Sequence, residues 1–397
     1  MKKTLLTLLA LIFAFTSLLP AQNAEADQAY IKAVTTQDPV QKVRLMKDYV
    51  NKYGGQGTKY ENFVYGNLCI IPSNEISSIE RINYGEKAIS LGNLEEMLFF
   101  QVYLTVSGLY SQSGQNLDKA KAHAQKAVQM AKSARSKATE PANKNQWGQL
   151  VAAAEFTGGQ AMEKGGDPKG ALKSYISAYN TLKNPQILAS IKKIGKSLYD
   201  TKQFKDAEQA FALTSKIDKD YANIAYYARC LHRNGKKNEA VVQYKQAYNK
   251  QKSGDLAYNI GILLAGQVKS NPAVSNEAIQ YLLDAAFLSK ANTEKAMTLA
   301  QGLFFNSANK NLQYNEKVQE LTARSKKLND MTEAFNTKYG EKDEEDLSDA
   351  EKKEMETELA NIDAEKKALD RLQTETSAAL EKFNQAIEAA KKRLGIG

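Results

Sequence analysis

A Gly-Lys-Ser triplet at 195–197 is the stretch of this sequence that comes nearest to a phosphate-binding loop. In such a loop, glycine amides surround the phosphates and the lysine pairs with them. The motif also needs a glycine five residues before its second glycine, but that position is Ser190, and the residues in between have the composition of a helix. We therefore predict no nucleotide or other cofactor here.

The histidines, cysteines and acidic runs also lack catalytic or metal-binding patterns. His123 and His232 have no HExxH-type neighbourhood, and Cys69 and Cys230 form no CxxC pair. The acidic run 341–346 lacks the alternating ligands and the turn glycine of a calcium loop, so it predicts a solvated turn between helices. There is no GxSxG motif either. We predict no catalytic residue, no metal site and no enzyme, with a catalytic site dispersed along the sequence as the alternative.

The composition favours a helical protein with a hydrophobic core. Of the 397 residues 43% are hydrophobic, which argues against disorder, and helix formers such as Ala, Leu, Lys, Glu and Gln dominate. Alternating β-branched residues are sparse, so we predict an all-α fold. Cys69 and Cys230 stand in apolar helical segments and are predicted to be buried free thiols, with a disulfide between them as the alternative.

The N-terminal segment predicts export. Lys2 and Lys3 precede an apolar run from Leu5 to Leu19, and small residues at 24 and 26 suit a signal peptidase. We predict a Sec-type signal peptide over 1–26, with an N-terminal membrane anchor as the alternative. No cysteine follows the apolar run, so a lipoprotein is not expected. No later stretch approaches about 18 apolar residues, which predicts a mature chain without an integral membrane segment, periplasmic or secreted.

An internal repeat of small residues predicts stacked helix–turn–helix pairs. Five alanines begin the second helix of each pair: Ala120, Ala171, Ala207, Ala240 and Ala278. Twelve residues before four of them, allowing one five-residue insertion, lie Gly159, Gly195, Ala228 and Gly261. Small residues at these places allow two helices to approach closely. The turns agree, because Asp167-Pro168 can start a helix and glycines 166 and 235 can end one.

These residues resemble the tetratricopeptide repeat (TPR) family over residues 97–290. The resemblance implies an all-α solenoid with a right-handed superhelix, which we place over 27–310, with a degenerate part at 27–92. The family's Trp position is not filled by Trp in any repeat, and the lone Trp147 lies in a connecting segment. A non-repetitive helical bundle is the alternative.

Residues 311–397 predict a long helical hairpin or coiled coil. Apolar residues recur at three- and four-residue steps over 318–339 and again over 355–394. The second series has three polar interruptions, Lys366, Gln373 and Thr376. We expect the second helix to overhang the first or to return onto the repeat array. Self-association through 311–397 as an intermolecular coiled coil is the alternative.

The resemblance implies that the first helices of the pairs line a concave groove. By repeat position, we predict a basic and aromatic partner-binding site in this groove: Lys192, Lys196, Tyr199, Tyr226, Arg229, His232, Arg233 and Tyr258. Aromatic rings and long cationic side chains suit extended peptides and carboxylates. The alternative is that these residues are solvated Lys and Arg beside tyrosines that pack between helices.

The sequence thus predicts a non-enzymatic interaction scaffold or adaptor of the bacterial cell envelope that binds an extended or acidic partner segment. The charge supports an acidic partner, because residues 27–310 carry a net charge of +13 and residues 311–397 one of −5. Alternatively, these two halves fold onto each other. A glycan-uptake or other envelope binding protein is the second alternative. Export and the absence of arginine clusters argue against nucleic acid.

Overall fold

The computed structural model describes residues 24–343, 345 and 347–396, and these residues form helices and turns without a β-strand. The predicted all-α fold is therefore confirmed. Residues 1–23 of the predicted signal peptide lie outside the described residues, while 24–26 open a helix that runs to residue 35. No helix in the described part of the chain is long and apolar enough to cross a membrane.

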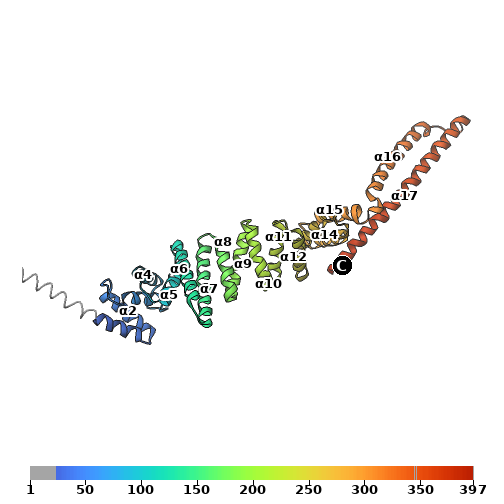
Figure 1. Cartoon of the computed structure of the whole chain (residues 1–397). Helices are drawn as coiled ribbons and strands as arrows, with labels where there is room; N and C mark the ends of the chain where they lie inside the picture. The colour runs from blue at the N-terminus through green and yellow to red at the C-terminus, as the bar shows by residue number, and fades with distance from the viewer. Residues whose placement is uncertain (1–23, 344, 346, 397) are drawn as a thin grey trace, which may run out of the picture. The chain divides into compact units, whose positions relative to one another are not determined.

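The chain divides into two compact units, one ending at Thr214 and the other beginning at Ser215, so the division falls within helix α10 (Figure 1). The first unit contains, after the opening helix, the following helices: α2 (Pro39–Tyr53), α3 (Glu61–Ile70), α4 (Ser78–Leu91), α5 (Glu96–Ser113), α6 (Leu117–Lys137), α7 (Pro141–Lys164), α8 (Pro168–Leu182), α9 (Pro185–Asp200) and most of α10 (Phe204–Ile217).

The second unit continues with helix pairs and ends in the hairpin. Its helices are α11 (Tyr221–Arg233), α12 (Lys237–Lys250), α13 (Gly254–Ala265), α14 (Ser275–Leu288), α15 (Thr293–Leu303), α16 (Tyr314–Tyr339) and α17 (Asp349–Leu394). Short 3-10 turns lie at Pro272–Val274 and Lys310–Leu312, and a π-helical turn lies at Phe304–Ala308.

Each unit is built as a solenoid. In the first unit, each of α5 to α8 packs against the helix that follows it, and α5 also packs against α3 and α7. The same successive packing runs from α11 to α15 in the second unit. We call the first helix of each pair helix A: α5, α7 and α9 in the first unit, α11 and α13 in the second.

The turns form as the sequence predicts. The Asp167 side chain accepts a hydrogen bond from the backbone N–H of Gly170, and Pro168 occupies the first turn of α8. Gly166 and Gly235 adopt φ angles of +77° and +81° after α7 and α11, a left-handed conformation that glycine adopts at little cost. These turns set the antiparallel pairing of neighbouring helices.

Close helix approach explains the repeated glycines. A Cβ atom on Gly159 would lie 2.6 Å from the Tyr175 ring, and one on Gly195 would lie 2.8 Å from the Ala210 Cβ. A Cβ on Gly261 would lie 2.7 Å from the Leu282 side chain. The predicted contact between first and second helices is therefore present in three successive glycine-bearing pairs.

The C-terminal residues form an antiparallel hairpin whose second helix returns to the repeats. Ion pairs join Lys317 to Glu375 and Lys338 to Glu354 across α16 and α17, at 2.7 and 2.8 Å. The C-terminal part of α17, past the segment that pairs with α16, packs against α14 and contributes Phe383 to the core of the second unit. The predicted hairpin and the return onto the array are thus seen in this unit, where α16 and α17 run side by side (Figure 1).

The apolar series predicted over 355–394 implies a continuous heptad contact surface (a seam) on α17, and this prediction is wrong at several positions. Lys366 and Gln373 are exposed, and so are Leu359 and Leu380, with 43% and 39% of their surface accessible. Only Thr376 of the three predicted polar seam residues is buried. The reason is geometric: from Leu359 to Leu380 only one of the two heptad positions is covered, because a single neighbouring helix covers a narrow stripe of α17, whereas Ile387 packs against the core of the second unit.

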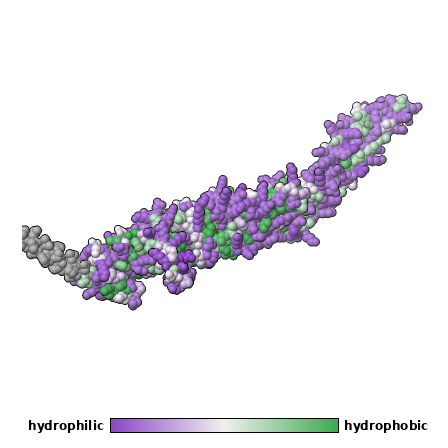
Figure 2. Space-filling view, in the orientation of Figure 1, coloured by the Kyte–Doolittle hydropathy of each residue, from purple (hydrophilic) through white to green (hydrophobic). Residues whose placement is uncertain are grey.

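The division into units does not follow the predicted domain limits. The predicted boundary at 310/311 falls between the π-helical turn and α16, inside the second unit. A separately folding hairpin at 311–397 stays a prediction. Hydrophilic residues cover most of the visible face of the hairpin, with paler residues scattered among them (Figure 2).

Candidate functional site

The predicted groove residues lie on three helix A elements, but these belong to two units. Lys192, Lys196 and Tyr199 lie on α9 in the first unit. The other five lie in the second unit, four on α11 and one on α13: Tyr226, Arg229, His232, Arg233 and Tyr258. The structure therefore presents them as two sets.

In the second unit, aromatic packing involves much of the predicted set. The Arg229 guanidinium lies 5.4 Å from the centre of the Tyr226 ring, a cation–π contact. His232 meets the Tyr244 ring edge-on, with 6.2 Å between centroids. Burial, and then the charges of Arg233 and Lys237, lower the pKa of His232. The imidazole is consequently neutral at pH 7, and the cationic charge of this set comes from the arginines.

In the first unit, the predicted set contains an exposed cation and a packed aromatic residue. The Lys196 side chain is exposed, and Lys192 is half-buried one turn earlier. The Tyr199 ring packs against Phe204 in a T-shaped contact at 5.4 Å. Part of the Tyr199 ring is therefore buried in the contact between α9 and α10.

A hollow of about 310 Å³ opens between the helix A elements of the first unit. Polar and charged side chains from four helices line it: Ser111 and Gln112 of α5, Gln160, Glu163 and Lys164 of α7, Tyr175 of α8, and Ser190 and Lys193 of α9. The spacing of successive helix pairs, set by the glycine contacts above, brings these side chains together.

Glu163 is the centre of this hollow. The Tyr175 hydroxyl donates a hydrogen bond of 2.7 Å to one of its oxygens, and the Lys193 ammonium lies 2.8 Å from the other. Burial and the hydrogen bond to Glu163 raise the pKa of Tyr175, so this side chain remains a neutral phenol at pH 7. The Lys193 side chain is 78% exposed, and it can reach solvent or a ligand at little cost.

A second lysine closes the other side of the hollow. The Lys164 ammonium donates a hydrogen bond of 3.1 Å to the backbone carbonyl of Gln112, which ties the end of α7 to the end of α5. The hollow thus contains two lysines and one carboxylate. Such a site can offer hydrogen bonds and a net positive potential to a ligand.

The predicted site does not include this hollow, because its residues are chosen by residue type. Gln160 and Glu163 occupy groove positions in the repeat numbering, but the predicted site favoured basic and aromatic residues. Lys193 adjoins the predicted Lys192, and a pattern of neighbouring lysines on α9 could have marked it. The approach of Lys193 to Glu163, thirty residues earlier, is set by helix packing and leaves no local pattern.

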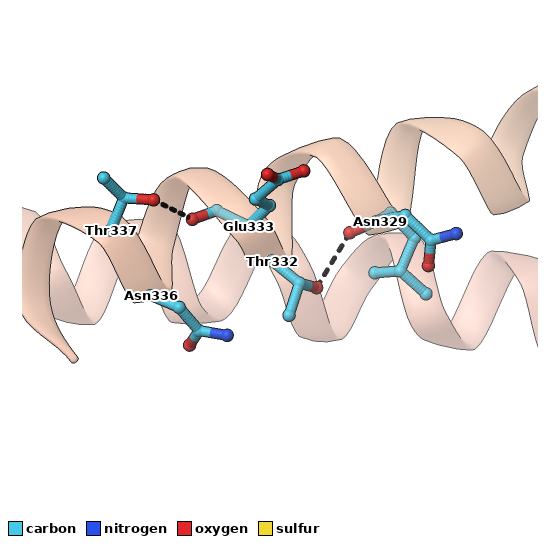
Figure 3. Close-up of a pocket in the computed structure, with 6 residues that line it drawn as sticks. Asn329, Thr332, Glu333, Asn336 and Thr337 are labelled. Carbon is cyan, nitrogen blue, oxygen red and sulfur yellow. Dashed lines mark hydrogen bonds between the residues drawn. The ribbon is translucent and has the colours of Figure 1, made fainter.

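Another depression lies along α16 in the hairpin (Figure 3). Its lining residues come from that one helix: Leu328, Asn329, Thr332, Glu333, Asn336 and Thr337. The hydroxyls of Thr332 and Thr337 donate to the backbone carbonyls of Leu328 and Glu333, one turn earlier. This surface is an open polar helix face without a cation, and it offers less chemistry than the hollow of the first unit.

The described residues contain no group of three or more His, Cys, Asp or Glu side chains that could hold a metal ion. Cys69 and Cys230 are both buried, as predicted, and they are not joined by a disulfide. Burial raises the pKa of Cys69 to about 12, so its thiol is protonated at pH 7.

No family model and no curated protein matches this sequence. Structure comparison finds solved TPR proteins. The YrrB TPR protein, described with an unusual peptide-binding site, has 19% identity and a TM-score of 0.32, over 54% of this chain and 97% of its own. A TPR protein from Parabacteroides merdae has 13% identity and a TM-score of 0.32, over 70% of this chain and 98% of its own. The TPR2AB domain of yeast Sti1 has 15% identity and a TM-score of 0.23, over 58% of this chain and 92% of its own.

The helices of this chain define its class. Their pairing, the small residues between them and their successive packing are those of an all-α helix–turn–helix repeat protein. The proteins to which the structure is similar are TPR proteins, the family that the sequence resembles.

Proposed function

We propose that this protein is a non-enzymatic interaction scaffold of the bacterial cell envelope that binds an extended, acidic segment of a protein partner. The observation that carries the proposal is the hollow in which side chains of α5, α7 and α9 converge around Glu163, Lys164 and Lys193. A surface formed by the first helices of three successive pairs suits an extended chain better than a compact small molecule.

The charge around the hollow supports an acidic ligand. The segment 164–205 contains nine lysines and only two aspartates. Within the hollow, the single carboxylate of Glu163 already accepts bonds from Tyr175 and Lys193. An incoming carboxylate can share the exposed Lys193 ammonium and also meets Lys164 across the hollow, whereas an incoming cation meets a surplus of like charge.

The binding of a fluorescein-labelled decapeptide of glutamate and aspartate, followed by fluorescence anisotropy at low salt, tests this proposal. The triple variant Lys192→Ala, Lys193→Ala and Lys196→Ala should bind the peptide about tenfold more weakly, since each charge pair contributes up to ~1 kcal/mol. Alanine is an excellent helix former, so the variant should fold.

The matched control removes the same charge from α6, in the triple variant Lys121→Ala, Lys126→Ala and Lys137→Ala. This control should bind within about twofold of the parent, because its lysines neither line the hollow nor lie beside Lys193 on α9. Equal weakening by both triple variants would show binding by net charge only. If the parent protein does not bind the peptide, the proposal is wrong.

The envelope location is a separate part of the proposal. It is supported by the basic start, the apolar run and the small residues at 24 and 26. Cell fractionation followed by N-terminal sequencing should find the protein outside the cytoplasm, beginning at Asp27. An intact N-terminus in the cytoplasmic fraction would contradict export.

A further inference from the structure

The sequence around the turn of the C-terminal hairpin is strongly acidic. Residues 341–358 contain ten acidic residues and three lysines. Some of this charge is neutralised locally, because Lys338 pairs with Glu354 and Glu358, and Lys342 pairs with Glu351. Five other acidic side chains are exposed, without an ion pair among the described residues: Glu341, Asp343, Glu345, Asp349 and Glu356. We call residues 341–358 the acidic tip.

The acidic tip is held away from the repeats of its own unit. The contacts of α17 with that unit's core come from Ala379, Phe383 and residues that follow. Asp284, a buried residue of α14, accepts a hydrogen bond from Arg393 and one from Tyr248. At 1.5 Å per residue, the twenty-one residues from Glu358 to Ala379 place the tip about 30 Å from the nearest of these contacts.

The same contacts keep the tip from folding back. Phe383 packs against Phe304 and Phe305, with ring centroids 5.2 and 5.9 Å apart. Since α17 is one continuous helix of 46 residues, moving the tip toward α14 would break either this packing or the helix itself. The exposed charge of the tip therefore points to a partner outside its own unit.

The lysine-rich segment 164–205 of the first unit is complementary to this tip. Its nine lysines and two aspartates give a net charge of +7, and residues 341–358 carry −7. Lys169 pairs with Asp206 and Lys193 with Glu163, and both lysine side chains are more than half exposed. Exposed ion pairs of this kind exchange partners at little cost.

We infer that the acidic tip of one copy of this protein binds the lysine-rich segment 164–205 of a second copy. The inference rests on the proposed function, because it names the acidic partner segment and a surface that includes Lys164 and Lys193 of the hollow. A contact between two different surfaces is head-to-tail, so it joins copies in series unless the rotation between them closes a ring. Because the contact is ionic, it weakens as salt shortens the screening length.

Sedimentation velocity of the full-length protein tests the inference. At about 50 mM salt the sedimentation coefficient should rise with protein concentration, and at about 500 mM salt it should not. The tip variant Glu341→Gln, Asp343→Asn, Glu345→Gln and Glu356→Gln should sediment as a monomer at both salt concentrations. The charge-matched control variant Glu316→Gln, Asp363→Asn, Asp370→Asn and Glu381→Gln, which changes exposed acids outside the tip, should associate like the parent.

The outcomes separate this inference from the proposed function. A parent protein that stays monomeric at low salt, or a tip variant that associates like the parent, overturns the inference. In either case, binding of the acidic decapeptide would leave the proposed function standing. If the parent is monomeric and the tip variant binds the decapeptide more tightly than the parent does, the tip competes for the site of its own chain. This outcome also overturns binding by a second copy.

Discussion

Gly159 illustrates how one residue sets the distance between two helices. Its Cα faces the Tyr175 ring, and an added Cβ would meet the ring at 2.6 Å. Tyr175 is fully buried and cannot rotate away without losing its bond to Glu163. We expect Gly159→Ala to destabilise the first unit by about 1–3 kcal/mol through overpacking, measured by urea unfolding.

Gly108 provides the matched control, because it holds the same repeat position one helix pair earlier. The nearest atom to a Cβ there would be the Thr157 methyl group at 3.9 Å, an ordinary contact. Gly108→Ala should therefore be neutral, or stabilising by up to about 1 kcal/mol through helix propensity. Equal destabilisation by both substitutions would show that the glycine contact is unimportant.

Glu86 organises a polar cluster that makes stability depend on pH. One of its oxygens accepts hydrogen bonds from Tyr110 at 2.8 Å, and from Lys119 and His123 at 3.2 Å. Burial alone would raise the pKa of Glu86, but the bonds from Tyr110, His123 and Lys119 outweigh it and lower the pKa. The carboxylate thus contributes stability above the unfolded-state pKa of about 4.3, and that contribution is lost as the pH falls through the lower folded-state value.

We expect Glu86→Gln to lower the free energy of unfolding by about 1 kcal/mol above about pH 5, and by progressively less toward pH 3. Urea unfolding of parent and variant across this range measures the difference. A difference that grows as the pH falls would contradict the assigned sign.

At the residue scale, the sequence predicts what local spacing encodes. The glycines and alanines recur at fixed steps, so their packing role could be read from the sequence. The partner of His123 could not be read from the sequence, because Glu86 lies 37 residues earlier in a different helix pair. For this histidine the sequence shows only that no metal-binding pattern surrounds it.

At the scale of helices, one buried carboxylate contributes to the register of the hairpin. Glu365 is 7% exposed and accepts hydrogen bonds from Arg324 and Lys327 of α16, at 3.0 and 2.9 Å. These bonds fix which turn of α17 faces which turn of α16. Glu365→Gln should increase hydrogen exchange in the middle of both helices, measured by mass spectrometry.

Lys366 is the control for this prediction, because it is the next residue and is exposed. Lys366→Gln should leave the exchange rates unchanged. If Lys366→Gln loosened the hairpin and Glu365→Gln did not, the heptad seam predicted from the sequence would be correct and the structure's register wrong.

The two helices also show where apolar periodicity stops being informative. The pattern over 318–339 and 355–394 correctly indicates long helices. It does not tell which of two heptad positions faces the neighbour, since Leu359 and Leu380 match the pattern yet are exposed. The choice depends on contacts with α16 and α14, which are distant in sequence.

At the scale of the whole molecule, the end of α17 contributes to the stability of the second unit. Phe383 is 3% exposed and packs against Phe304 and Phe305 of the π-helical turn. Phe383→Ala should destabilise this unit by about 3 kcal/mol, measured by chemical denaturation followed by circular dichroism. Leu380→Ala, one turn away and 39% exposed, should cost less than about 1 kcal/mol.

A melt unaffected by Phe383→Ala would show that the repeats of the second unit do not need the helix. In that case the hairpin would be the separate domain that the sequence predicts at 311–397.

The whole-molecule prediction from sequence succeeded for the fold, whereas the predicted site residues stay a prediction. Repeat spacing indicates paired helices in series, and the structure contains them. The predicted groove combined residues by repeat position as if one surface held them, but Lys196 and Arg229 lie in different compact units. Within the first unit, the chemistry converges on Glu163 and Lys193, whose pairing depends on the distance between α7 and α9.

Photo-crosslinking of the acidic decapeptide, with a benzophenone at its centre, tests the central claim most directly. Peptide mapping should place the crosslinks on α5, α7 and α9 around Gln112, Gln160 and Lys193, and the Lys192→Ala, Lys193→Ala, Lys196→Ala variant should lose them. Crosslinks concentrated on α6 or in the second unit, and unchanged in that variant, would contradict binding at this hollow.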